Sequence, residues 1–139
     1  MPRYDIPEIP DDITIVSEER LMQMFMQFVG WQTFAATEFA AAEVEEERAD
    51  RLVRRLEAQH MVLNWGAAKD KVTLARAQQA MDPEIDRAKN KQLEAYASRK
   101  MRQVVYENCV ACAAALSREL TRRTGRGGDV ERRATRWSP

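Results

Sequence analysis

The chain has 139 residues, of which 45% are hydrophobic, 32% are charged and 7% are aromatic, and its formal net charge is zero. This length corresponds to one domain at most, and the balanced total charge argues against a uniformly basic nucleic-acid-binding protein. A composition rich in Ala, Glu, Arg and Gln, with few strand-forming residues, predicts long helices.

The first sixteen residues contain Pro2, Pro7 and Pro10 and show no helical period. We therefore predict an extended arm over residues 1–16, whose isoleucines could lie on another surface, such as that of a neighbouring subunit. Residues 1–20 hold six acidic residues and two arginines, which gives a net charge of −4. Such an asymmetry predicts either an anionic partner for the basic parts of the chain or head-to-tail attraction between subunits.

A helix is predicted to begin at Ser17, because its hydroxyl can accept a hydrogen bond from the first turn. Glu18 and Glu19 follow, where the helix dipole favours negative charge. Apolar side chains then recur at steps of three and four, which indicates a buried face. We predict that this first long helical segment covers about residues 17–65.

A shorter helical connector is predicted over residues 67–80, and the alternative is that residues 67–81 form a hinge instead of a continuous helix. The next residues, Asp82, Pro83 and Glu84, indicate a helix start. Asp is a good cap, Pro is tolerated in the first turn because its missing amide is not needed there, and Glu complements the dipole.

The second long helical segment is predicted to run over residues 83–124 and to stop at Gly125. At about 1.5 Å per residue it would be about 60 Å long, so it needs a comparably long helix or several subunits to cover it. Residues 125–139 are predicted to form a flexible basic tail. The expected fold class is all-α, with a single helical domain at residues 17–124 built of two long, antiparallel and coiled-coil-like segments in an oligomeric protein.

Two apolar stripes, at residues 21–39 and 93–120, are predicted to form the contacts of a homo-oligomer. The first could instead be a partner groove or a lipid-surface helix, although its glutamine-rich polar side argues against anionic membranes. The predicted interface residues are Leu21, Phe25, Phe28, Trp31, Met101, Val105, Cys109, Cys112, Leu116 and Leu120.

The spacing of Cys109 and Cys112 is formally that of a C-x-x-C motif. A zinc site needs four ligands, and the sole histidine, His60, has no ligand-like neighbours. A thioredoxin-type pair lies at a helix N-terminus after a strand, whereas this pair lies inside a predicted helix. We therefore expect packing cysteines, no metal site, no cofactor and a reducing compartment. No signal peptide is visible, and polar residues interrupt the longest apolar stretch, so no membrane span is expected.

Basic residues are concentrated in two stretches. Residues 69–102 hold nine basic and five acidic residues, and residues 118–139 hold seven and three, so each stretch has a net charge of +4. An oligomer would repeat these cations, and phosphate binding strengthens with the number of cations engaged. Ordinary solubilising charge is the alternative interpretation. The candidate nucleic-acid-binding residues are Lys69, Lys71, Lys89, Lys91, Arg99, Lys100, Arg102, Arg118, Arg122, Arg123 and Arg126.

Three short segments resemble phage recombination mediators of the UvsY type. They are Arg55–Gln59 (RLEAQ) near the end of a long charged helix, Asp82–Ile85 (DPEI) at the start of the last helix, and Ala113–Arg118 (AAALSR) near its end. The resemblance covers about residues 20–120. It implies an all-helical oligomer that binds single-stranded DNA and helps to load a RecA-like recombinase against single-strand-binding protein. In that family basic residues follow the first segment closely, whereas here they resume only at Lys69.

The sequence therefore predicts a single-stranded-DNA-binding accessory protein of phage-type recombination or replication. It would act as a recombinase-loading mediator through a repeated basic surface on a homo-oligomer, in the cytoplasm of a bacterial host cell. One alternative is a scaffold or virion assembly protein whose helices only mediate association. Another is a small regulator that binds a host protein through its Met-rich helix. An enzyme is not expected, because no paired acid and base, nucleophile elbow or phosphate loop is found.

Overall fold

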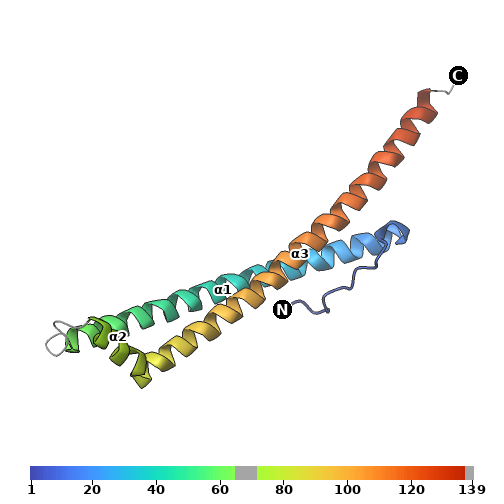
Figure 1. Ribbon diagram of the computed structural model, residues 1–139. Helices are drawn as coiled ribbons and strands as arrows, with labels where there is room; N and C mark the ends of the chain where they lie inside the picture. The colour runs from blue at the N-terminus through green and yellow to red at the C-terminus, as the bar shows by residue number, and fades with distance from the viewer. Residues whose placement is uncertain (65–71, 137–139) are drawn as a thin grey trace. The chain divides into compact units, whose positions relative to one another are not determined.

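The computed structural model describes residues 1–64 and 72–136 (Figure 1). A short 3-10 helix, η1 (Ile13–Ile15), is followed by α1 (Glu18–Asn64), α2 (Val72–Met81) and α3 (Pro83–Arg136), and no strand occurs within the described ranges. The prediction of an all-α chain with two long helices is confirmed, and α2 confirms the helical connector over the residues described there, whereas residues 67–71 of the predicted connector lie outside the described residues. Within the described ranges, no helix is both long and apolar enough to cross a membrane.

Two compact units divide the chain. Unit 1 comprises Met1–Thr37 and Val104–Pro139, and unit 2 comprises Glu38–Gln103. Helices α1 and α3 each contribute to both units. In each unit the segment of α1 packs against the segment of α3 in an antiparallel sense.

Both long helices begin at the residues that the sequence marks as caps. The Ser17 hydroxyl accepts a hydrogen bond from the amide of Arg20 at 3.2 Å, and the Asp82 carboxylate accepts one from the amide of Glu84 at 2.8 Å. Each cap satisfies an amide that has no partner within its own helix. The predicted starts at Ser17 and Asp82 are confirmed.

The predicted end of the last helix is wrong, because α3 continues through Gly125 to Arg136. None of the described glycines has a positive φ, so Gly125 does not form the left-handed cap that ends many helices. The helical part of the chain therefore extends twelve residues beyond position 124, into the predicted tail.

The core of unit 1 is made by three segments: the arm, the first turns of α1, and α3. Its buried members are Leu21, Met24 and Phe28 from α1 and Cys109, Ala113 and Leu116 from α3. Ile9, Ile13 and Val16 of the arm pack against this cluster. Residues 1–16 thus cover the chain's own core.

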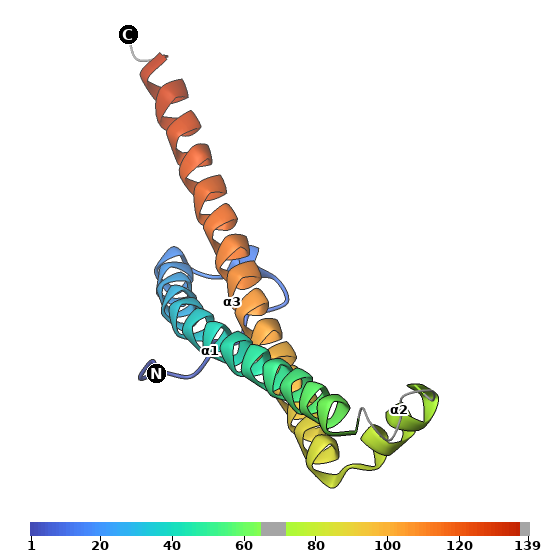
Figure 2. The same cartoon turned by 90° about the vertical axis from the view of Figure 1, so that its left-hand side faces the viewer.

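The arm runs back beside α1 (Figures 1 and 2), and a polar contact and a close approach attach it there. The indole Nε1 of Trp31 donates a hydrogen bond to the carbonyl oxygen of Tyr4 at 2.9 Å. The ring of Tyr4 lies against Gly30, where a Cβ atom would overlap with the Tyr4 hydroxyl oxygen. Glycine at position 30, costly in a helix interior by about 1 kcal/mol relative to Ala, therefore makes room for the arm.

Unit 2 has a smaller apolar core, consisting of Ala42, Val53, Ile85 and Ala88. Polar contacts connect its helices instead. Gln92 of α3 donates to the Asp50 carboxylate of α1 at 2.8 Å. Gln79 of α2 donates to the backbone carbonyl of Glu57 at 2.9 Å, which holds α2 against α1.

We predict that Gly125→Ala stabilises the last turns of α3. The added Cβ would meet nothing within 4 Å, and Ala is favoured over Gly in a helix interior by about 1 kcal/mol. Far-UV circular dichroism and amide hydrogen exchange should show higher helix content and slower exchange after residue 120. Unchanged or faster exchange there would mean that the chain is not helical at Gly125.

Candidate nucleic-acid interface

Three of the predicted DNA-binding cations in unit 2 are held by acidic residues of α1. The Lys89 ammonium lies 3.3 Å from the Glu57 carboxylate, and Arg102 pairs with Glu38. Arg99 binds both carboxylate oxygens of Glu46, its Nε at 2.6 Å and its Nη2 at 3.3 Å. These three cations join α3 to α1, so their charge is already matched within the unit.

Arg99 and Glu46 form the most enclosed of these pairs, with side chains 18% and 21% exposed. The hydrogen bond to Glu46 raises the pKa of the Arg99 guanidinium above its usual value. The guanidinium also lies over the ring of Tyr96, 5.2 Å from its centroid. A guanidinium bound on these sides is poorly placed to take up a phosphate group.

Two other predicted cations of unit 2, Lys91 and Lys100, are exposed. The ammonium of Lys100 lies 5.8 Å from the centroid of the Tyr96 ring, and neither lysine takes part in any ion pair recorded among the described residues. Lys69 and Lys71, which the sequence also suggested, lie outside the described residues.

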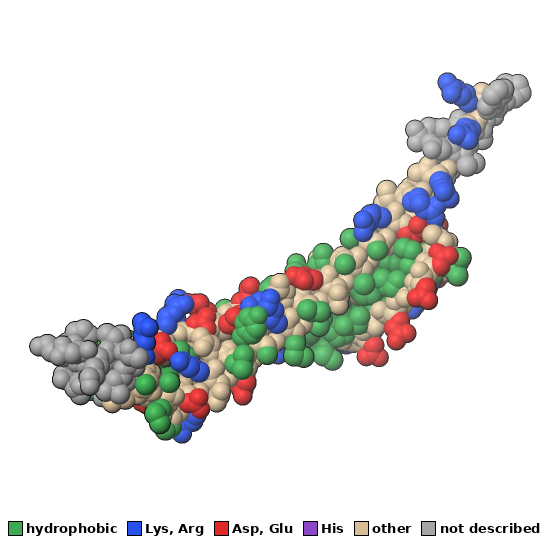
Figure 3. Space-filling view, in the orientation of Figure 1, with side chains coloured by type: hydrophobic (Ala, Val, Ile, Leu, Met, Phe, Trp, Pro, Cys, Tyr) green, Lys and Arg blue, Asp and Glu red, His purple; other side chains and the backbone are tan. Residues whose placement is uncertain are grey.

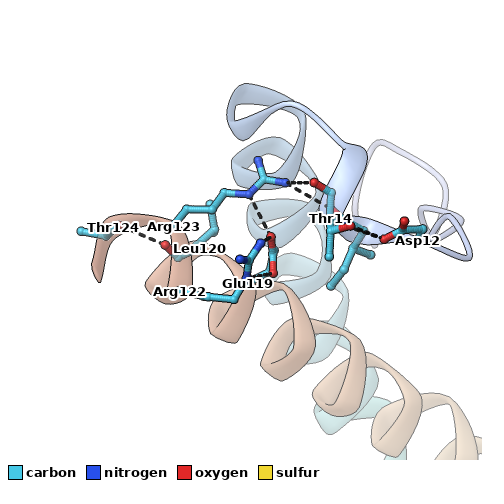
Figure 4. Close-up of polar contacts among 8 residues, drawn as sticks. Asp12, Thr14, Glu119, Leu120, Arg122, Arg123 and Thr124 are labelled. Carbon is cyan, nitrogen blue, oxygen red and sulfur yellow. Dashed lines mark hydrogen bonds and ion pairs between the residues drawn. The ribbon is translucent and has the colours of Figure 1, made fainter. Parts of the chain in front are cut away.

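In unit 1 a carboxylate organises two of the predicted arginines (Figure 4). Glu119, only 6% exposed, accepts hydrogen bonds from Arg122 at 2.5 and 2.8 Å and from Arg123 at 3.0 Å. Arg123 also donates to the backbone carbonyls of Ile13 and Thr14, at 3.2 and 3.1 Å. The Glu119 cluster, defined as Glu119, Arg122 and Arg123, therefore fastens the arm to α3.

The hydrogen bonds of this cluster shift proton affinities. Those from Arg122 and then Arg123 lower the pKa of Glu119 from 4.5 to about 2, and the bond to Glu119 raises the pKa of Arg122. In the arm, the side-chain and backbone hydrogen bonds from Thr14 lower the pKa of Asp12. Glu119 is thus an anion at neutral and mildly acidic pH, where its hydrogen bonds hold Arg122 and Arg123 in place.

Among the side chains that the structure describes, four arginines of α3 are exposed on one side of unit 1. On a helix of about 3.6 residues per turn, their positions fall within about a quarter of the circumference. We call this the arginine face, consisting of Arg118, Arg126, Arg133 and Arg136. Figure 3 shows Lys and Arg side chains along the last turns of α3, beyond the hydrophobic side chains that cover the paired part of unit 1.

The sequence indicated only part of this surface. Arg118 and Arg126 were predicted, whereas Arg133 and Arg136 were missed, because the helix was expected to end at Gly125 and a flexible tail presents no face. The role of Glu119 could have been found from its spacing, since Arg122 and Arg123 follow it by three and four residues on the same helix.

Most of the predicted oligomer-interface residues belong to the core of unit 1. Leu21, Phe28, Cys109 and Leu116 are at most 2% exposed within one chain, which leaves them no surface to offer a neighbour. Their predicted role as interface is therefore corrected to core. Phe25, Trp31, Cys112 and Leu120 are partly buried and pack against the same cluster. Met101 and Val105, at 71% and 42% exposed, do retain a free surface.

Cys109 and Cys112 are free thiols that pack in unit 1. Burial raises the pKa of both thiols, and the neighbouring Cys112 adds to the effect at Cys109. A raised pKa disfavours the thiolate needed for nucleophilic or metal-binding chemistry. Among the described residues, no three or more His, Cys, Asp or Glu side chains are grouped to hold a metal ion.

Neither a family model, nor a curated protein, nor a solved structure matches this chain.

We predict that Glu119 makes the stability of the fold depend on acidic pH. Because its pKa is lower in the folded chain than in the unfolded chain, its contribution is complete above about pH 4.5 and is lost as the pH falls toward 2. The free energy of unfolding, measured with urea at several pH values, should fall across this window. Glu119→Gln should lower stability at neutral pH and remove this part of the pH dependence.

Glu94→Gln is the matched control, because it removes one carboxylate from an exposed position of the same helix. It should leave the pH dependence close to that of the wild type. If Glu119→Gln and Glu94→Gln give the same profile, the Glu119 cluster does not fasten the arm as described.

Proposed function

We propose that the protein binds single-stranded DNA through the arginine face of α3, as an accessory factor of phage-type recombination or replication. The observation that carries this proposal is the exposure of Arg118, Arg126, Arg133 and Arg136 on one side of a single helix. The other predicted cations of unit 1 are engaged by Glu119, and three of unit 2 are engaged by α1. Arg118 donates a hydrogen bond only to the backbone carbonyl of Ala114, and no ion pair involves the four arginines of the face among the side chains that the structure describes. Cations that no carboxylate holds can exchange counterions for phosphates.

A helix with arginines on one side can follow a phosphate backbone without reading its sequence. Guanidinium groups bind phosphate oxygens in a fork geometry and can also stack on unpaired bases. Tight binding requires several such contacts, and one chain offers four in this face, so a homo-oligomer would strengthen the binding by repeating them. Binding is expected to weaken steeply with salt and to show little sequence preference.

The recombinase-loading role is the finer part of the proposal, and it rests on the resemblance to recombination mediators of the UvsY type. In this role the bound strand is presented to a RecA-like recombinase in competition with single-strand-binding protein. The proposed location is the cytoplasm of the host cell, where that DNA is replicated and recombined.

We predict that the quadruple change of Arg118, Arg126, Arg133 and Arg136 to Ala abolishes most single-stranded DNA binding. Fluorescence anisotropy with a labelled oligo-dT strand, at low and physiological salt, should show wild-type binding that falls with salt. The variant should lose up to about 2.8 from the slope of log K against log salt, which is four contacts at about 0.7 each.

The matched control removes four exposed cations from unit 2, by changing Arg76, Arg87, Lys91 and Lys100 to Ala. It changes the net charge by the same amount and should bind nearly as well as the wild type. Loss of binding in the control alone would move the site to unit 2. An absence of wild-type binding at low salt would overturn the DNA proposal and favour a scaffold or a protein-binding regulator.

A further inference from the structure

One stretch of α1 carries no charged residue, although charged residues make up 32% of the chain. It extends over residues 21–37, between Arg20 and Glu38. One side of it forms the core of unit 1. The opposite side is exposed, so an uncharged helix surface about four turns long faces outward from this unit.

The exposed side presents apolar groups in a regular order. Met22, Met26 and Val29 are 49%, 59% and 36% exposed, and Thr33 follows them, also exposed. Their separations of four, three and four residues are those of a coiled-coil seam. We call these four residues the seam face. They lie beside the core residues of α1 in the sequence but on the other side of the helix.

The threonines of this surface have their hydroxyl groups satisfied by the helix itself. The Thr33 hydroxyl donates to the carbonyl of Val29 at 3.1 Å, and the Thr37 hydroxyl donates to the carbonyl of Thr33 at 3.2 Å. A hydroxyl bonded in this way needs no further donor contact when it is covered, so burial costs less than for a free hydroxyl. The seam face can therefore be buried without leaving the hydroxyl proton of Thr33 unpaired.

We propose that the seam face docks against the seam face of a second copy of this chain, as a two-fold dimer. In coiled coils, charges beside the seam select the partner and its orientation. Here the flanking positions include Gln23 and Gln32, which carry no charge, so two identical faces meet without repulsion. A charged partner would gain no ion pair there.

The side chains of the seam also suit a like partner. Methionine is unbranched and flexible, and it adapts to an opposing methionine without a shaped pocket. Two-fold self-association is the commonest form of oligomer and needs only one self-complementary patch. This dimer forms without nucleic acid, so it does not depend on the proposed DNA binding, although it would double the number of arginine faces available to a strand.

The test is the mass of the full chain in solution without nucleic acid, measured by light scattering and sedimentation equilibrium over a wide range of concentration. The wild type should be a dimer. The double variant Met26→Lys and Thr33→Lys should be a monomer, with self-association weakened by more than about a hundredfold, because each lysine is buried twice across a two-fold contact.

Two further variants separate the docking surface from general effects. Ala114→Lys places a lysine on an exposed position of α3 in unit 1, to be compared with the single changes Met26→Lys and Thr33→Lys, and should remain a dimer. Thr33→Val keeps the seam apolar and should dimerise at least as tightly as the wild type. Circular dichroism should show wild-type helix content for every variant, so that a change in mass reports the surface rather than unfolding.

A wild-type monomer at all concentrations would overturn the proposal, and so would a dimer unaffected by the double lysine variant. Equal disruption by Ala114→Lys would also contradict it, because the contact would then not be specific to the seam face. The outcome is distinguishable from that of the DNA proposal. Failure to bind oligo-dT leaves the dimer mass unchanged, whereas loss of the dimer leaves residual binding to the arginine face.

Discussion

A long helix can bury only one stripe of its surface against a single neighbour, and the apolar side chains outside that stripe stay exposed unless another element covers them. In unit 1 the first turns of α1 are apolar over much more than one stripe. The side with Leu21, Met24 and Phe28 is buried against α3 and the arm, whereas the side with Met22 and Met26 is left uncovered within the chain. The use of the arm as a third core segment and the proposed self-association both follow from this excess.

In both units a segment of α1 packs against a segment of α3, but the contacts are mainly apolar in unit 1 and largely polar in unit 2. Unit 1 encloses large side chains, including Phe28 and Leu116, and the Glu119 carboxylate is buried where the arm meets α3. In unit 2 the buried positions include Ala42 and Ala88, and much of the contact between helices is polar. Ion pairs on a protein surface contribute little to stability, typically about 0–1 kcal/mol each. The polar contacts of unit 2 are therefore better suited to fixing the register of the helices than to supplying most of its stability.

Local signals in the sequence were enough to predict the helices but not their faces. The caps at Ser17 and Asp82 depend on neighbouring residues alone, and both were found. The interface prediction failed at Leu21 and Phe28, because a helix that is apolar nearly all round gives no period from which to choose the side that faces its partner. The predicted helix end at Gly125 was wrong because a local signal was given too much weight. The local cost of glycine, about 1 kcal/mol in a helix interior, favours a stop, but that cost is too small to end a helix by itself.

The nucleic-acid-binding residues could be predicted only in part, because some basic residues form ion pairs with acidic residues that are distant in the sequence. Arg99 and Glu46 are separated by 53 positions, so their ion pair is invisible until the fold brings α3 beside α1. A list of basic residues therefore overestimates the cations that are available to a ligand. The spacing of Glu119 to Arg122 and Arg123 was the exception, because all three lie on adjacent turns of one helix.

The arginine face and the seam face lie in the same unit but have opposite requirements. Four guanidinium groups on one helix repel one another and bind polyanions better when more of them act together, so they benefit from a second copy. They cannot provide the contact that brings a second copy, because like charges oppose it. The uncharged surface at residues 21–37 has no such conflict. Placing association on a neutral side of α1 and phosphate binding on the exposed end of α3 would let each copy add cations to a shared strand without bringing its own arginines into the dimer contact.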